Sequence, residues 1–132
     1  MNFHHLGIFV KDLEYGNDYL NKLLPIKKSG KIYHDTFLKV SVQFLYDDNN
    51  MCYEIVAPNG KNNPVDLVLK NKKNILNHIA YKTNNLEHYI SYYREKGCFQ
   101  CGDPKPALAF DNARIVFFYT PLKILIELIE KK

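Results

Sequence analysis

The sequence predicts an α+β fold built from two tandem βαβββ modules. A shift of 73 residues aligns the two halves of the chain, with Glu54-Ile55-Val56 on Glu127-Leu128-Ile129 and Phe44 on Phe117. Each half shows the same order of strand and helix patterns, and a turn-rich segment separates the halves. Self-similarity at a fixed period indicates a duplicated unit. By its length of 132 residues the chain is a single domain, made of two copies of that unit.

The first module is expected over residues 1–58. The apolar run from Phe3 to Val10 has β character, and Asp12 is a good N-cap for a helix over Leu13 to Leu24. Apolar and β-branched runs then predict three strands, over Lys31 to Tyr33, Phe37 to Tyr46 and Met51 to Ala57. The first half therefore has the order βαβββ.

The second module is expected over residues 75–132, after a connection over 59–74 that has room for one short helix. Ile75 to Lys82 has strand character, Asn84 or Asn85 can cap the next helix, and Gly97 can end it. Three more strands are predicted near Cys98 to Gly102, Arg114 to Tyr119 and Lys123 to Ile129. The order of the first half is repeated.

Composition narrows the class of protein. The net charge of +4 is mild and no nucleic-acid-binding module is visible, so no nucleic-acid partner is expected. No apolar stretch approaches the ~18 residues of a membrane span, and the first residues lack the pattern of a signal peptide. Three cysteines, an odd number, fit a reducing compartment. We therefore expect a cytoplasmic protein without a membrane partner.

One pair of residues recurs at the same spacing in both modules. His5 precedes Glu54 by 49 positions, and His78 precedes Glu127 by 49. A Glu inside a core-forming strand is costly to bury alone, so it is normally paired, hydrogen-bonded or bound to a metal. Imidazole and carboxylate suit Zn, Ni, Fe, Co and Mn. These four residues therefore predict one divalent metal site, while polar groups satisfied at a sheet edge are the structural alternative.

Four segments resemble the signature segments of the vicinal oxygen chelate superfamily, which is the glyoxalase, bleomycin resistance and dioxygenase fold. They are His5 to Glu14, Tyr53 to Pro58, Asn77 to Tyr81 and Ile126 to Glu130. The resemblance is closest to the glyoxalase I and methylmalonyl-CoA epimerase branches. It implies an open, barrel-like sheet with a cleft. In that cleft, His5, Glu54, His78 and Glu127 would hold one Zn, Ni, Co or Mn ion. A homodimer is expected.

The implied reaction is a proton transfer next to a carbonyl, as in a lyase or isomerase of glyoxalase or epimerase type. A divalent ion holding two substrate oxygens acts as a Lewis acid and stabilises the enediolate. Glu127, and also Glu54, are the candidate bases, because a carboxylate in an apolar cleft can have a raised pKa. Gln43 and Arg114 are candidate substrate-binding residues, although a surface ion pair is an equal alternative for Arg114. The substrate would be a small carbonyl compound or an acyl-CoA.

Two positions depart from the glyoxalase I pattern. Bacterial-type enzymes hold glutathione with an Arg four residues after the first His and an Asn four after the first Glu, where this chain has Phe9 and Pro58. Glutathione recognition is therefore not expected. Epimerases often have Gln at the position of Glu54, and their second base would fall near Val42 or Gln43, neither of which is a carboxylate.

A non-catalytic role is the alternative from another class. Drug-sequestering proteins of the bleomycin-resistance type share the fold, bind small molecules without metal and lack the four-ligand set. Ten tyrosines and eight phenylalanines could line an aromatic groove, although aromatic residues at such spacings are more often core. Cys98 and Cys101 have the spacing of half a zinc site, but the chain has no second pair.

Overall fold

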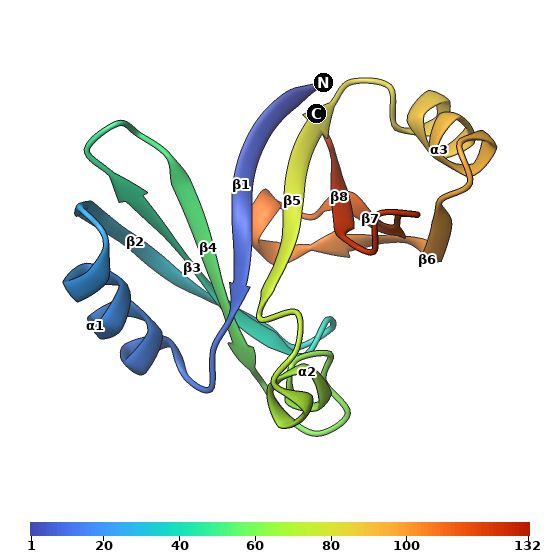
Figure 1. Cartoon of the computed structure of the whole chain (residues 1–132). Coiled ribbons are helices and arrows are strands. Elements are labelled where there is room, and N and C mark those ends of the chain that lie inside the picture. Colours follow the sequence, from blue (N-terminus) through green and yellow to red (C-terminus); the bar gives the residue numbers. More distant parts are fainter. The chain divides into compact units, whose positions relative to one another are not determined.

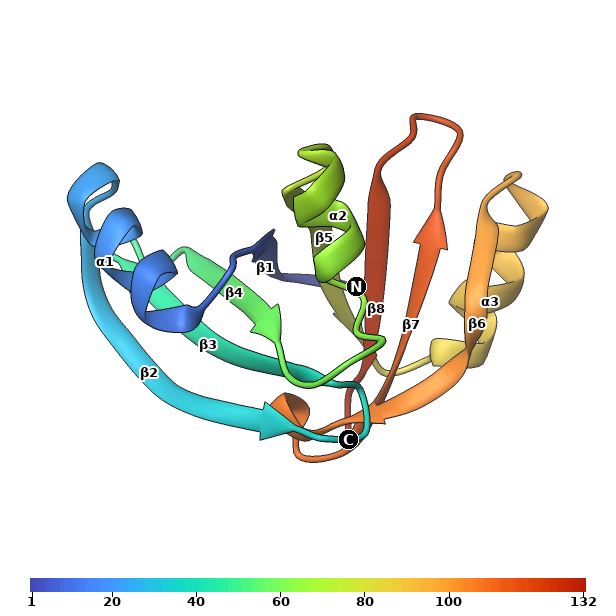
Figure 2. The same cartoon turned by 90° about the horizontal axis from the view of Figure 1, so that it is seen from below.

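The computed structural model describes all of residues 1–132 and divides them into two compact units (Figures 1 and 2). One unit is formed by His5–Asn77, and the other by Met1–His4 together with His78–Lys132. The α+β class and the βαβββ order of both modules are confirmed. The elements are β1 (Asn2–Phe9), α1 (Leu13–Leu23), β2 (Ile26–Asp35), β3 (Val40–Asp47), β4 (Cys52–Pro58), α2 (Asp66–Asn71), β5 (Leu76–Thr83), α3 (Leu86–Glu95), β6 (Phe99–Ala107), η1 (Leu108–Phe110), β7 (Ala113–Tyr119) and β8 (Leu125–Glu130).

In the first unit, four strands form a sheet in the order β2-β3-β4-β1. β1 runs parallel to β4, and the other neighbours are antiparallel. Helix α1 covers one face, where Leu13 packs with Leu45 and Ile55 in a buried cluster. As predicted, Asp12 caps this helix, because its Oδ1 accepts the N–H of Tyr15 at 2.7 Å. The opposite face of the sheet is therefore left for other side chains.

The second unit repeats this arrangement with the order β5-β8-β7-β6. β5 and β8 are parallel, and helix α3 covers one face, where Ile90 packs with Phe118 and Leu128. Asn85 is the cap, since its Oδ1 accepts the N–H of His88 at 3.3 Å. Gly97, at φ +87°, follows the helix with a backbone that a side chain would strain. No helix of the chain has both the length and the hydropathy needed to cross a membrane.

The two outermost strands are longer than the sequence predicted. β2 covers ten residues where Lys31 to Tyr33 was expected, and β6 continues to Ala107 through Pro104 and Pro106. Both pair with only one neighbour and carry an irregular register. A proline is tolerated in such an edge strand because its missing N–H need not face a partner. The parts of β2 and β6 that extend beyond the predicted Lys31 to Tyr33 and Cys98 to Gly102 therefore read as loops in the sequence and form strands in the fold.

Strand β3 starts three residues later than predicted. Residues 36–39 form a turn, in which the N–H of Leu38 donates to Oδ1 of Asp35 at 2.9 Å and Lys39 has φ +60°. The aromatic residue Phe37, which suggested a strand, is 63% exposed at this turn. Local hydrogen bonding to Asp35 therefore overrides the strand propensity of Phe37.

Candidate metal centre

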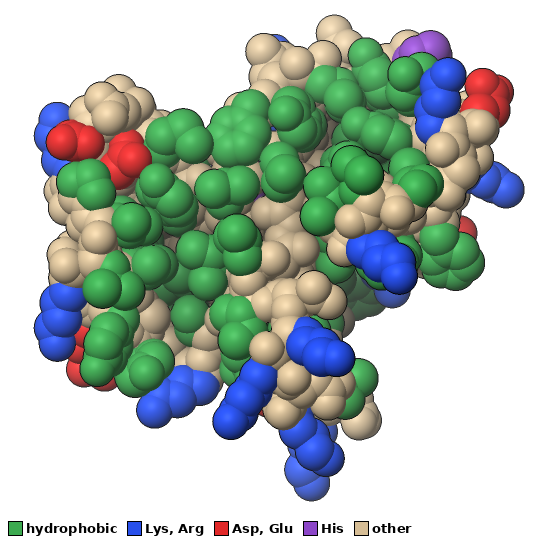
Figure 3. All heavy atoms as spheres, in the orientation of Figure 1, with side chains coloured by type: hydrophobic (Ala, Val, Ile, Leu, Met, Phe, Trp, Pro, Cys, Tyr) green, Lys and Arg blue, Asp and Glu red, His purple; other side chains and the backbone are tan.

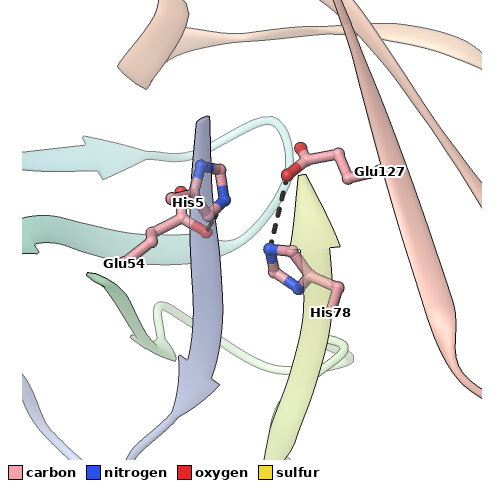
Figure 4. A group of neighbouring side chains, drawn as sticks. All are labelled: His5, Glu54, His78 and Glu127. Carbon is pink, nitrogen blue, oxygen red and sulfur yellow. Dashed lines mark ion pairs between the residues drawn. The ribbon is translucent and has the colours of Figure 1, made fainter. Parts of the chain in front are cut away.

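Each unit contains one buried pair of a histidine and a glutamate. In the first unit, Nε2 of His5 lies 3.3 Å from Oε1 of Glu54. In the second, Nε2 of His78 lies 3.3 Å from Oε1 of Glu127 (Figure 4). All four residues are at most 5% exposed. The repeated 49-residue spacing thus corresponds to two pairs of equal geometry.

Strand parity places the first pair on the face opposite α1. In the register of β1 and β4, Gly7 is opposite Glu54, whereas Ile55 belongs to the buried cluster under α1. Since successive side chains alternate between faces, His5 and Glu54 share the other face. Phe44, the cross-strand neighbour of Glu54, meets the His5 ring edge to face with centroids 5.7 Å apart.

The second pair is placed by the same rule. Glu127 lies opposite Phe117 in the register of β8 and β7, while the next residue, Leu128, packs under α3. The ring of Phe117 meets the ring of His78 edge to face, with centroids 5.1 Å apart. The repeated element is therefore a trio of His, Glu and Phe. The alignment of Phe44 with Phe117 was visible in the sequence, but their contact with the histidines was not predicted.

The separation within each pair distinguishes two kinds of contact. A charge-assisted hydrogen bond between nitrogen and carboxylate oxygen is about 2.7 to 2.9 Å long. Two ligands bound ~2.1 Å from one ion, at tetrahedral or octahedral angles, lie about 3.0 to 3.4 Å apart. The value of 3.3 Å in both pairs matches the second geometry. Nitrogen and carboxylate oxygen are also donors that zinc and its neighbours accept, so the donor set fits a divalent ion.

Cys52 shares the face of Glu54, two residues before it on β4. Its side chain is buried, and burial raises the pKa of the thiol to about 11. A hydrogen bond with Tyr46 opposes this rise, and the Glu54 carboxylate adds to it. The thiol is therefore neutral at physiological pH, and the face around Glu54 is apolar apart from the paired groups.

We expect Cys52 to be unreactive in the native protein, because it is both buried and protonated. At pH 8, Ellman's reagent should modify the exposed Cys101 quickly and should reach Cys52 only after unfolding in denaturant. The control is Cys101→Ser, which should lose the fast phase and keep the slow one. Rapid modification of all three thiols without denaturant would contradict the burial of Cys52.

The two residues predicted to bind substrate lie on the helix-covered faces. Gln43 is opposite Ile55 in the register, and its Nε2 donates to the carbonyl oxygen of Gly30 at 2.8 Å. Gln43 thus joins β3 to the irregular part of β2. The side chain of its neighbour Val42 lies on the other face of the sheet, the face that carries Glu54. Period-two alternation from Phe44 would have assigned Gln43 to this face from the sequence.

Arg114 was predicted either to bind substrate or to form a surface ion pair, and in the structure it forms the ion pair. Its Nη2 lies 2.6 Å from Oε2 of Glu130 and 3.0 Å from Oε1 of Glu87, and its Nε donates to Oε1 of Glu130 at 3.2 Å. These contacts join β7 and β8 to α3, on the opposite face from Glu127. The structure therefore gives Arg114 a role in holding the helix to its sheet and not a place beside the His78 and Glu127 pair.

Arg114→Met should lower the stability of the fold by roughly 1 kcal/mol at neutral pH, a modest loss because the pair is partly exposed. The hydrogen bonds from Arg114 hold the pKa of Glu130 below its ordinary value. This stabilisation is therefore present above the ordinary pKa of Glu and is lost as pH falls through the lowered one. Urea unfolding at pH 7 and pH 3 measures both effects, with Arg94→Met as the control. An equal loss in both variants would argue against the pair.

The comparison with known families supports the fold that the sequence predicts. A model of the Glyoxalase/Bleomycin resistance protein/Dioxygenase superfamily matches residues 4–118. The chain belongs to this superfamily. The predicted resemblance is thereby confirmed. A search of curated protein sequences gives no match.

Solved structures with the same fold include two named enzymes. A hypothetical protein from Bacillus halodurans C-125 has a TM-score of 0.82 and 21% identity, over 99% of this chain and 94% of that one. A methylmalonyl-CoA epimerase from Mycobacterium tuberculosis has a TM-score of 0.78 and 20% sequence identity, over 99% of this chain and 88% of that one. Methylmalonyl-CoA epimerase from Streptomyces coelicolor, in complex with 2-nitronate-propionyl-CoA, has a TM-score of 0.74 and 20% sequence identity, over 99% of this chain and 97% of that one. At these identities the similarity concerns the fold.

Proposed function

We propose that the two His–Glu pairs together hold one divalent metal ion, and that the protein catalyses a proton transfer at the carbon next to a carbonyl. The observation that supports this most directly is the equal separation of 3.3 Å in two buried pairs. Burying an ion pair is costly, because both charges lose their hydration, and the replacement of such a pair by apolar residues is often neutral or stabilising. Two of them at equivalent positions of a duplicated unit are therefore better explained by a shared ligand.

The proposed roles follow from the chemistry of the four side chains. When bound, the ion supplies Lewis-acid polarisation of a substrate carbonyl. His5 and His78 hold the ion as neutral imidazoles, and Phe44 and Phe117 pack against their rings and limit access of water. Glu127 is our choice for the base that takes the proton, because it lies between Leu125 and Ile129 on an apolar strand. Glu54 is the second candidate.

Metal content and proton exchange together test this proposal. Purified protein would be dialysed against chelator, reloaded with Zn, Ni, Co or Mn and analysed for bound metal per chain. The loaded protein would then be incubated in D₂O with 2-oxo compounds and acyl-CoA thioesters, and deuterium at the α-carbon would be followed by NMR. We expect about one ion per chain, consistent with a four-ligand site, and metal-dependent exchange. Metal-free protein with undiminished exchange would contradict the mechanism.

Glutathione hemithioacetal should be a poor substrate for this protein. Phe9 is buried and has no charge, and Pro58 offers no amide side chain, so neither supplies the groups that glyoxalase I enzymes use at these positions. We expect kcat/KM for lactoylglutathione formation to be ~100-fold or more below that for the preferred substrate, because a missing charged contact and a missing hydrogen bond each cost about 1.5 to 3 kcal/mol. The assay is the absorbance of the thioester product. Efficient product formation would refute the expectation.

A homodimer is part of the proposal, and sequestration of a small molecule without catalysis is the alternative to it. Several large apolar side chains are well exposed, among them Phe99 at 70% and Leu122 at 82%. Figure 3 shows hydrophobic side chains at the surface of the molecule. Exposed apolar surface of this kind is typical of an interaction site. Light scattering after size-exclusion chromatography measures the oligomer, and metal content separates the enzyme from a metal-free binding protein.

A further inference from the structure

We propose that the connection between the modules, residues 59–74, binds the phosphate groups of a coenzyme A thioester. This inference rests on the proposed function and deepens it, because it names the class of carbonyl substrate. It is drawn from the charge of the connection, from a hollow that the connection lines, and from its position relative to strand β1.

The connection concentrates the positive charge of the chain. It contains four lysines and one aspartate, a net charge of +3, beside +4 for the whole protein. The carboxylate of Asp66 accepts a hydrogen bond from the side chain of Asn63 at 2.8 Å. The four lysines are Lys61, Lys70, Lys72 and Lys73. All four are exposed, and none of them takes part in an ion pair. Several blue Lys or Arg side chains gather over α2 in Figure 3.

The same segment lines a hollow with a volume of about 600 Å³. Its lining residues combine two apolar side chains, two amides and one ammonium group, and they are Leu67, Val68, Asn71, Lys73 and Asn74. A volume of this size is in the range of small-molecule and cofactor sites. Leu67 is 66% exposed although apolar, so it is available to contact a ligand. Apolar contact beside amides and ammonium groups suits a purine that carries phosphates.

The end of the connection lies within reach of the long arm of such a substrate. The N–H of Phe9 donates to the carbonyl oxygen of Ile75 at 2.9 Å, which fixes the end of the connection at the end of β1. His5 lies four residues earlier in the same strand, or about 13 Å away at ~3.3 Å per residue. A coenzyme A thioester has its carbonyl at one end of the pantetheine arm and its phosphates at the other. A short 2-oxo acid has no group that could reach from His5 to the connection.

Calorimetric titration of the full-length, metal-loaded protein with coenzyme A, 3′-dephospho-coenzyme A and pantetheine tests the proposal. The variant replaces three lysines of the connection by glutamine, at Lys70, Lys72 and Lys73. The matched control replaces three exposed lysines elsewhere, at Lys22, Lys27 and Lys96. We expect the connection variant to bind coenzyme A roughly tenfold or more weakly at low salt, and the control to bind normally. Pantetheine should bind both variants alike.

Two outcomes would overturn the inference. One is equal loss of coenzyme A binding in the connection variant and the control. The other is wild-type protein that binds coenzyme A no more tightly than pantetheine. Binding of coenzyme A that depends on the connection, without any proton exchange, would contradict the proposed reaction and leave the phosphate site standing. Exchange on a thioester with an unchanged KM in the connection variant would contradict the phosphate site alone.

Discussion

Replacement of His5 or His78 by alanine is expected to lower the affinity for divalent metal by ~100-fold or more, since even groups that only orient a metal ligand contribute 10- to 100-fold. Each histidine is almost fully buried with its Nε2 turned toward a glutamate oxygen 3.3 Å away, so its truncation removes one nitrogen donor from the proposed ligand set. The equal geometry of the two pairs predicts similar losses from the two variants.

Metal titration by calorimetry and the shift of the melting temperature with added metal are the measurements for this prediction. A ligand that binds only the folded state raises its stability in proportion to the logarithm of its concentration, so the wild type should gain stability with metal and the variants should not. His88→Ala is the matched control, because His88 is exposed on α3. Full affinity in His5→Ala or in His78→Ala would remove that residue from the ligand set.

Glu127→Gln is expected to reduce proton exchange at the substrate α-carbon by roughly 10² to 10⁴-fold, the range for a lost general base. The amide keeps an oxygen that can ligate the ion but cannot accept the proton. Glu127 is 2% exposed and lies opposite Phe117, in surroundings that penalise its charged form when no cation is near. Metal binding should fall much less than exchange does.

The matched comparison is Glu54→Gln, since Glu54 occupies the equivalent position of the first module. We expect this variant to keep most of its exchange activity, because Glu54 is assigned chiefly as a ligand. Deuterium incorporation in D₂O, followed by NMR with metal-loaded protein, measures both. If Glu54→Gln is the inactive variant, the base is Glu54. If neither variant loses exchange, the proton is taken by another group.

The fold and the proximity of each His–Glu pair could be predicted because they rest on repetition and on alternation within strands. The 73-residue shift identified the modules, and the equal His-to-Glu spacing identified pairs that the structure brings to 3.3 Å. Gln43 lies on the helix-covered face, because side chains alternate along a strand and its neighbour Phe44 is the one that faces Glu54.

The length of β2 and β6 was not predictable from local pattern. These strands are held mainly by backbone hydrogen bonds to one neighbour, and their own residues show little apolar alternation. The partners of Arg114 were equally hidden, since Glu87 and Glu130 are 27 and 16 residues away in sequence. Contacts of this kind depend on how a helix lies on its sheet, which strand and helix patterns do not specify.

The irregular outer strands also affect how the protein behaves at high concentration. An exposed sheet edge is a template for strand addition by another molecule, and natural proteins interrupt such edges with prolines, lysines and bulges. β6 has Pro104 and Pro106 within an irregular register, and β2 carries Lys27, Lys28 and Lys31 beside its own irregularity. Both terminal edges are thus poor acceptors for a further strand. Because the sheet edges resist the addition of a further strand, copies of the chain would associate through the exposed apolar side chains.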